Sequence, residues 1–324
     1  MVIENLFMRF IISLSFAFNF YLIAAQSTLA TTDSIVQNRW VDSVYNSLST
    51  KQKIGQLFMI QVFSEENNIN KSKLINIIKD YQVGGVIFSK GGPVRQANLN
   101  NELQRASKLP LMIAMDAEWG LNMRLDSTYA FPWNMTLGAI TDLNLIQKTG
   151  QRIGAHCKRL GVHLNFAPVV DINTNPKNPI IGNRSFGEDK QNVTDKALAF
   201  MQGLQSTGVM ASAKHFPGHG DTDKDSHKTL PTVNFSKKRI QNIETYPYKT
   251  LIENGLSSVM VAHLNVPALE PKEQYPSSLS DKIVRKFLKL KLNFKGLIFT
   301  DALDMKGVSN FTTPGAIDLQ AFKA

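Results

Sequence analysis

Residues 209–231 read VMASAKHFPGHGDTDKDSHKTLP, an apolar run followed at once by a dense cluster of titratable side chains. The cluster, residues 214–231, includes three histidines and three aspartates. Its glycines and prolines favour a defined loop path over a flexible one. Because rigid scaffolds present functional residues on such loops, we expect a buried strand over residues 209–213 and an active site in the loop that follows it.

The same order of apolar strand, polar loop and amphipathic helix is repeated from residue 50 onward. The expected strands are short and apolar on both faces, as buried parallel strands are. They cover residues 54–62, 85–88, 111–115, 162–168, 209–213, 258–263 and 296–300. Helix patterns cover residues 143–160, 192–206, 237–253 and 280–289, with Asp142 and Ser280 as expected N-caps and Gly161, Gly208 and Gly255 as expected stops. This alternation predicts a parallel α/β sheet.

Polar residues follow nearly every expected strand at its carboxyl end. They include Asp116 and Glu118 after the third, Asp171 after the fourth, His263 after the sixth and Asp301 after the seventh. In a barrel these ends meet at one rim, whereas a doubly wound sheet offers one or two crevices and carries a glycine-rich phosphate loop that is missing here. We therefore predict a TIM-type (β/α)8 barrel. Seven strands can be counted, so the barrel is expected to be truncated before its last strand.

Four motifs carry a family resemblance. They are FAPVVDIN at 166–173, IGNRSFG at 181–187, the loop at 214–231 and FTDALDMKG at 299–307. In this order they resemble glycoside hydrolase family 3, in its branch of β-N-acetylglucosaminidases (β-N-acetylhexosaminidases) that act on peptidoglycan fragments. The resemblance implies that residues 49–324 form the family's N-terminal catalytic barrel, C-terminally incomplete, behind a lead-in segment at 26–48. It also implies hydrolysis that releases β-linked N-acetylglucosamine from a glycan, without a cofactor.

Retaining hydrolysis needs a nucleophile and an acid/base on the two sides of the glycosidic bond. The resemblance assigns the nucleophile to Asp301, at the end of the strand at 296–300, and the acid/base to His227 paired with Asp225. In an extended loop these two side chains point to the same side, and the carboxylate favours the imidazolium that protonates the leaving oxygen. A helix N-cap is the alternative role for Asp301, and a surface ion pair is the alternative for Asp225 and His227.

The resemblance further implies that Asp116, Arg184, Lys214 and His215 contact sugar hydroxyls. Carboxylates and forked guanidinium groups suit a ring rich in hydroxyls.

Two roles stay open for each of three other residues. Trp119 is either a stacking platform for a sugar or a packed core indole. Arg124 either supports Asp116 or belongs to an ion pair of the scaffold, and His263 either lines the pocket or is a buried histidine with satisfied hydrogen bonds.

A metal site is the competing interpretation of the loop at 214–231. The histidines at 215 and 219 have the spacing of two ligands on a helix, but Pro217 and Gly218 exclude that helix. The aspartates at 221–225 resemble the start of a calcium loop, which then lacks glycine at its sixth position (Ser226) and an acid at its twelfth (Thr232). We expect no metal.

Bulk composition describes an ordinary globular protein, with 43% apolar and 19% charged residues in 324. The net charge of +10 is scattered over expected helix faces and is not interleaved with aromatics, which argues against a nucleic-acid partner. It indicates either a solvated helix surface or attraction to an anionic polymer such as cell-wall material. Cys157 is the single cysteine, so no intrachain disulfide forms.

The first 25 residues read as a signal peptide. Arg9 precedes an apolar run that ends at Ala25. We expect an exported protein, periplasmic or extracellular, without stable membrane insertion after cleavage. An uncleaved anchor is the alternative, since Glu4 and Asn19 are unusual in such a leader.

Two other functions stay open. One is a different glycosidase of the family, of the β-glucosidase type, although the loop at 214–231 argues against it. The other is a glycan-binding barrel without catalysis, although the intact Asp301, Asp225 and His227 argue against that. A neutral imidazole in the acid/base role would also admit phosphate in place of water. The sequence does not indicate an oligomeric state.

Overall fold

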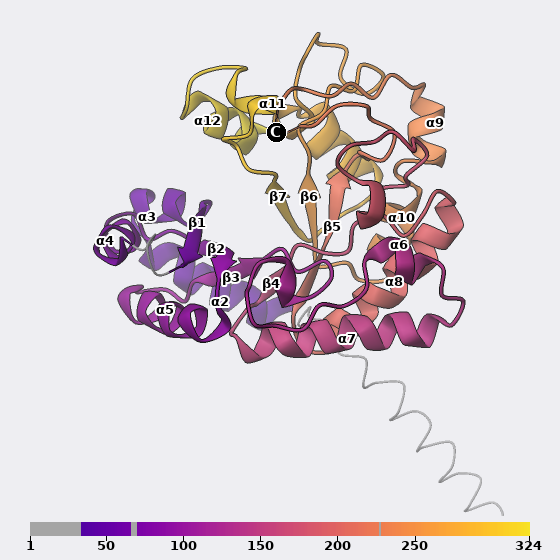
Figure 1. Ribbon diagram of the computed structural model, residues 1–324. Coiled ribbons are helices and arrows are strands. Elements are labelled where there is room, and N and C mark those ends of the chain that lie inside the picture. Colours follow the sequence, from indigo (N-terminus) through magenta and orange to yellow (C-terminus); the bar gives the residue numbers. More distant parts are fainter. Residues whose placement is uncertain (1–33, 66–69, 227) are drawn as a thin grey trace, which may run out of the picture. The chain divides into compact units, whose positions relative to one another are not determined.

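The computed structural model describes residues 34–65, 70–226 and 228–324 (Figure 1). The chain divides into two compact units, Met1–Asp42 and Ser43–Ala324. Helix α2 (Ser34–Ser47) begins in the first unit and ends in the second. The expected signal peptide at 1–25 and the start of the lead-in segment lie outside the described residues. None of the helices in the described ranges has the length and apolar character needed to cross a membrane.

The second unit is built on a parallel sheet, whose seven strands in the described residues are paired in chain order. They are β1 (Met59–Ser64), β2 (Gly85–Gly91), β3 (Met112–Met115), β4 (Leu164–Asn165), β5 (Met210–Phe216), β6 (Ser258–Val261) and β7 (Leu297–Thr300). Parallel strands in chain order with helical crossovers are the arrangement of a (β/α)8 barrel. The predicted fold is confirmed, and β1 and β7 are the two edges of the sheet within the described part of the chain (Figure 1).

Further helices lie before, between and after the strands. They are α3 (Thr50–Gly55), α4 (Lys71–Tyr81), α5 (Pro93–Ala106), α6 (Asn134–Gly138), α7 (Leu143–Arg159), α8 (Lys190–Gln205), α9 (Lys237–Asn242), α10 (Tyr246–Glu253), the π-helix η4 (Lys282–Lys291), α11 (Lys306–Ser309) and α12 (Ala316–Lys323), with 3-10 turns at η1 (Leu121–Met123), η2 (Gly182–Arg184) and η3 (Ser277–Leu279). The expected cap of α7 is present, since the Asp142 carboxylate accepts the Asn144 N–H at 2.9 Å. Helix α7 buries Ile146, Ile153 and Cys157, at the spacing of one helix face.

The described residues form three clusters of buried apolar side chains, the third of which is Leu279, Val308 and Ile317 after β6 and β7. A large cluster of buried side chains lies between the sheet and the helices, and in it Phe216 of β5 meets Tyr248 of α10 edge to face, with ring centroids 5.0 Å apart. A smaller cluster consists of Ala114, Leu164, Phe166 and Met260, from β3, β4 and β6 and from the residue after β4. These side chains form the layer that fills a barrel interior, so the strand ends around it are held rigidly.

Three of the predicted elements differ most from the structure at their boundaries. The strand expected over 162–168 is limited to Leu164–Asn165. The strand expected from residue 54 begins at Met59 instead, because Ser49 and Gln52 form a capping box that starts helix α3 over the preceding residues. The helix expected over 237–253 is broken into α9 and α10. Pro247 lies in the first turn of α10, where its missing N–H is tolerated and where it cannot continue a preceding helix.

Two further differences concern single residues. Ser280 is not the N-cap of the helix that follows it, since η4 starts after Asp281, but its hydroxyl still accepts the Ile283 N–H at 3.3 Å. Strand β5 runs on to Phe216, so Lys214 and His215 belong to the end of a strand rather than to the expected loop. Strand backbone gives these two side chains fixed directions, which matters for the site that they form.

Candidate active site

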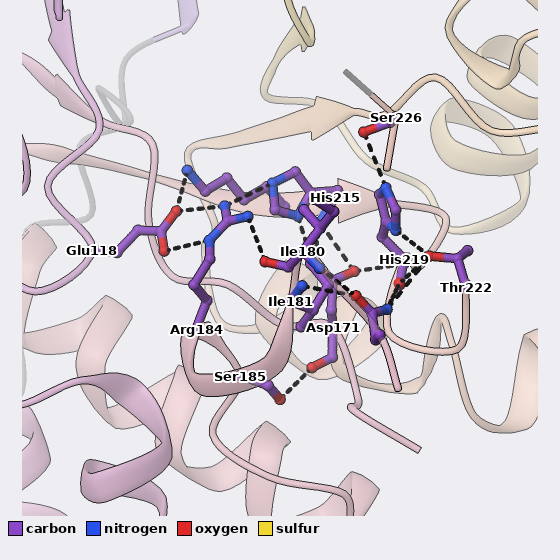
Figure 2. Close-up of polar contacts among 12 residues, drawn as sticks. Glu118, Asp171, Ile180, Ile181, Arg184, Ser185, His215, His219, Thr222 and Ser226 are labelled. Carbon is purple, nitrogen blue, oxygen red and sulfur yellow. Dashed lines mark hydrogen bonds and ion pairs between the residues drawn. The ribbon is translucent and has the colours of Figure 1, made fainter. Parts of the chain in front are cut away.

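Charged side chains from the segment after β3, from η2 and from the end of β5 meet in one cluster, of which Figure 2 shows Glu118, Arg184 and His215. Lys214 on β5 is almost fully buried, and its Nζ lies 2.7 Å from Asp116 Oδ1 and 2.8 Å from Glu118 Oε1. Arg184, at the end of η2, binds Glu118 through two hydrogen bonds of 2.7 and 3.0 Å. Two carboxylates and two cations therefore compensate each other at the rim, as buried charges must.

The electrostatics keep both carboxylates ionised. Burial raises the pKa of Glu118, but Arg184 and Lys214 outweigh burial and hold the pKa well below its ordinary value. The pKa of Asp116 is likewise lowered, because Lys214 and Arg124 together outweigh its burial. Arg124 Nη2 lies 2.6 Å from Asp116 Oδ2, so this arginine supports Asp116 through an ion pair.

His215 is locked in one tautomer by its two neighbours. Its Nδ1 lies 2.6 Å from Asp171 Oδ2, and its Nε2 lies 3.2 Å from Arg184 Nη2. Because a guanidinium group only donates, Nε2 accepts and Nδ1–H donates to Asp171. Asp171 is buried and also accepts the backbone N–H of His219 at 2.7 Å, so one carboxylate fixes the start of the loop after β5.

His219 extends this chain of hydrogen bonds into the loop. Thr222 donates its hydroxyl hydrogen to the His219 carbonyl at 3.1 Å, so its oxygen accepts Nδ1–H of the His219 ring at 2.6 Å. The Nε2 atom of that ring then accepts the hydroxyl of Ser226 at 3.1 Å (Figure 2). Burial lowers the pKa of His219 to about 4, which keeps the ring neutral near neutral pH.

Asp301 follows β7 directly and is half-buried. Its backbone N–H donates to the Val261 carbonyl at the end of β6 at 2.8 Å, and its carboxylate accepts the Ala302 N–H at 2.9 Å. The next helix, α11, begins at Lys306 with Met305 as its cap. A helix-capping role for Asp301 is therefore excluded.

His263 supports the backbone beside Asp301. It is fully buried, with Nδ1 2.7 Å from Ser278 Oγ and Nε2 2.9 Å from the Ala302 carbonyl oxygen. Burial lowers the pKa of His263, and the Asp301 charge partly opposes that shift, as it also does for His219. His263 is thus a buried histidine with satisfied hydrogen bonds. The negative charge of Asp301 lies close enough to the rings of His263 and His219 to raise the pKa of each.

The structure joins Asp116, Arg184, Lys214 and His215 in one network, as described above. Asp225 lies in the loop after β5, and its carbonyl accepts the N–H groups of Lys228 and Thr229 at 3.0 and 2.9 Å. The pairing of the Asp225 side chain with His227 stays a prediction. His227 lies outside the described residues.

Three residues of the network were not among the predicted site residues: Glu118, Asp171 and His219. Glu118 could have been found from its place two residues after Asp116, because alternate residues of an extended segment share a side. Asp171 was noted only for its position after a strand, and His219 only as a residue of the loop at 214–231 with a spacing that resembles metal ligands. Among the described residues, no group of three or more His, Cys, Asp or Glu side chains is arranged to hold a metal ion.

This fold and site place the chain among the (β/α)-barrel proteins that build a polar site at the carboxyl rim of their strands. Residues 49–324 match the model of the glycosyl hydrolase family 3 N-terminal domain. The chain belongs to glycoside hydrolase family 3, as its motifs indicated.

Two of the relatives with similar sequences are beta-hexosaminidases by name. The chain is 33% identical over 334 residues to Beta-hexosaminidase A of Pseudoalteromonas piscicida, covering 96% of this chain and 55% of the relative. It is 35% identical to Beta-hexosaminidase of Nitrosomonas eutropha, covering 71% of this chain and 68% of that protein. The chain thus spans little more than half the length of the first of these relatives.

Solved structures extend the comparison. The family 3 β-N-acetylglucosaminidase of Paenibacillus sp. FPU-7 superposes with a TM-score of 0.80 at 37% identity, over 85% of this chain and 53% of that one. The β-glucoside phosphorylase BglX superposes with a TM-score of 0.82 at 27% identity, over 92% of this chain and 59% of that one. The chain is similar to a glycosidase and to a phosphorylase. The shared barrel therefore does not by itself show whether water or phosphate accepts the sugar.

Proposed function

We propose that this protein is a retaining glycoside hydrolase that releases β-linked N-acetylglucosamine from glycans through a covalent glycosyl–Asp301 intermediate. His227, held by Asp225, serves first as the acid and then as the base. The family membership and the names of the relatives at 33–37% identity support the reaction class and the sugar. We further propose that the protein is exported and acts on wall-derived glycans, which its net charge of +10 would attract.

The observation that carries the proposal is the setting of Asp301. Its carboxylate is half-buried at the end of β7, it caps no helix, and its charge acts on the ring of His219 in the loop after β5. A carboxylate fixed at a strand end, beside the loop that bears Asp225, is suited to attack an anomeric carbon from one face of a sugar while that loop supplies the proton on the other.

The first half of the reaction breaks the glycosidic bond. A carboxylate oxygen of Asp301 bonds to the anomeric carbon as the leaving oxygen departs with a proton from His227. In the second half, His227 takes a proton from water, the hydroxide bonds to the anomeric carbon, and Asp301 is released. The network after β3 and β5 serves binding. Asp116 and Arg184 are its more accessible members, with side chains 14% and 18% exposed, and they are placed to bind sugar hydroxyls.

The experiment measures 4-nitrophenol release from the β-N-acetylglucosaminide and from the β-glucoside by the full-length protein and by Asp301→Asn and His227→Ala. Asp304→Asn is the matched control, since that aspartate is exposed three residues further on. We expect turnover of the acetamido sugar, a loss on the order of 10³-fold or more in Asp301→Asn, a strong reduction in His227→Ala and near wild-type activity in the control. Turnover of the glucoside alone would favour the β-glucosidase class. Turnover of neither by a folded protein would favour a glycan-binding barrel.

Phosphorolysis is a second candidate, because the chain superposes on a phosphorylase as well as on a hydrolase. Repeating the assay in phosphate buffer and analysing the released sugar distinguishes the two. A sugar 1-phosphate would favour transfer to phosphate, and free sugar alone would exclude it.

A further inference from the structure

One arginine outside the charged network joins the loop after β5 to the helices that follow it. Arg239 on α9 has its Nη2 atom 2.7 Å from Asp221 Oδ2 in that loop, and its Nε–H donates to Glu244 Oε1 at 3.1 Å. Glu244 lies in the break between α9 and α10. A single guanidinium group therefore bridges a carboxylate of the loop and a carboxylate of the helix junction, with a different nitrogen atom for each.

The guanidinium group of Arg239 is held in a fixed direction. Ser236 caps α9, and its hydroxyl oxygen accepts the Arg239 N–H at 3.2 Å. The guanidinium group lies over the Phe235 ring, 4.1 Å from the ring centroid, where the aromatic face attracts a cation. The side chains of Arg239 and Asp221 are 33% and 20% exposed, so their ion pair is screened less by water and salt than a fully exposed pair.

The backbone of the loop rests on the same helix junction. Gly218 has a φ of +140°, and a Cβ at this position would lie 2.7 Å from Glu244 Cβ. Glycine thus lets the loop approach Glu244 closely. Glu244 is itself buried. The loop is therefore fixed against the junction of α9 and α10 at two points, Gly218 and Asp221.

The anchored residues connect directly to the buried hydrogen bonds of the site. Asp221 precedes Thr222, whose hydroxyl oxygen accepts Nδ1–H of His219. The His219 ring in turn accepts the hydroxyl of Ser226, which directly follows Asp225. A displacement of Asp221 would therefore pass through Thr222 and His219 to the neighbour of Asp225.

We propose that Arg239 is a positioning residue, which holds the loop after β5 where Asp225 can serve the acid/base step. This inference rests on the proposed function and adds to it a residue that acts through the loop. Proton transfer requires hydrogen-bond distance to the leaving oxygen, so a small misplacement of the loop lowers its rate. Loss of the guanidinium group should therefore impair protonation of the leaving oxygen more than the attack by Asp301.

The test compares two leaving groups on the full-length protein. 4-Nitrophenolate is a stable anion and leaves with little help from an acid, whereas the sugar that leaves N,N′-diacetylchitobiose needs a proton. We expect Arg239→Ala to lower kcat/KM for the disaccharide about ten-fold more than for the 4-nitrophenyl β-N-acetylglucosaminide. Arg239→Lys keeps the charge without the fork and should recover part of the loss. Lys238→Ala, at the exposed neighbouring position of α9, is the matched control and should leave the ratio unchanged.

A double-mutant cycle assigns the effect to the ion pair between Arg239 and Asp221. Asp221→Asn should change the ratio of the two substrates in the same direction. The double variant should lose little more than either single variant, because both changes remove the same contact. Additive losses would mean that the two residues act separately, and would overturn the anchor.

Hydrogen exchange separates failure of the anchor from failure of the proposed function. Exchange of the backbone amides at 218–226 is followed in the wild type, in Arg239→Ala and in Lys238→Ala. Faster exchange in Arg239→Ala alone supports the anchor even if no sugar is cleaved, in which case only the proposed activity fails. An unchanged exchange rate would overturn the anchor. Cleavage of both substrates with an unchanged ratio in Arg239→Ala would overturn the positioning role and leave the glycosidase intact.

Discussion

At the residue scale, Glu118 has the most ion-pair partners in the site, because this fully buried carboxylate pairs with both Lys214 and Arg184. Glu118→Gln keeps the shape and removes the charge, so Arg184 loses its bidentate partner and Lys214 keeps only Asp116. We expect the free energy of unfolding to fall by about 3–5 kcal/mol, the usual cost of breaking a buried ion pair, and glycosidase activity to fall with it. Urea unfolding measures the loss. Glu253→Gln, at an exposed position of α10, is the control, and an equal loss in both variants would contradict this role for Glu118.

Ser226 is the second residue with a separable role. Its hydroxyl bonds Nε2 of His219, and its carbonyl accepts the Gly307 N–H at 3.1 Å, so it links the loop after β5 to the segment after Asp301. Ser226→Ala removes the only donor that the described contacts give to this ring nitrogen. We expect kcat to fall about 10- to 100-fold with little change in KM, because misplaced catalytic groups cost rate more than binding. Ser226→Thr restores a hydroxyl and should recover most of the rate. Equal KM and kcat effects in both variants would count against a positioning role.

At the element scale, the contact between α7 and α8 depends on two glycines. A Cβ at Gly150 would lie 2.2 Å from the Phe200 carbonyl oxygen, and a Cβ at Gly203 would lie 1.9 Å from the Gln147 carbonyl oxygen. Glycine to alanine within a helix normally stabilises by about 0.5–1 kcal/mol. Here the clash with backbone reverses the sign, and we expect Gly150→Ala to destabilise by about 1–3 kcal/mol.

Thermal unfolding measures that change, with Lys148→Ala on the exposed side of α7 as the control. The control should be neutral or slightly stabilising, because alanine favours the helix. A Gly150→Ala protein that melts at or above the wild-type temperature would mean that the two helices separate at little cost.

The elements also show how far the sequence predicts this protein. All seven strands were found, because buried parallel strands are continuous apolar runs, and the errors fell where local chemistry overrides that pattern, at the capping box of Ser49 and at Pro247. The family resemblance implied Asp116, Arg184, Lys214 and His215 as site residues. The partners of these residues were harder to predict, because the bonds from Arg184 to Glu118 and from His215 to Asp171 join residues 66 and 44 positions apart, and such pairings exist only once the strand ends are assembled.

At the scale of the whole molecule, the buried titratable groups of the site make the protein less stable as the pH falls. The pKa of His219 is about 4 in the folded chain and 6.5 in the unfolded reference, so the unfolded state takes up a proton first as the pH falls. Its stabilising contribution is complete above pH 6.5 and is lost between pH 6.5 and 4. The difference between these two pKa values corresponds to a loss of stability on the order of 3 kcal/mol. Glu118 and Asp116, whose folded pKa values are depressed, add a further loss below their ordinary values of 4.5 and 3.8.

We therefore expect the free energy of unfolding in urea to be nearly constant from pH 8 to 6.5 and to decline steadily toward pH 4. His219→Asn should be less stable at pH 8, since its hydrogen bonds to Thr222 and Ser226 are disturbed, and its stability should change less between pH 6.5 and 4. The slope is therefore the quantity to compare. His156→Gln on α7 is the control and should keep most of the wild-type slope, because His156 is only partly buried. A His219→Asn protein with the full wild-type slope would place the acid sensitivity elsewhere in the fold, since the ring would then titrate alike in the folded and unfolded states.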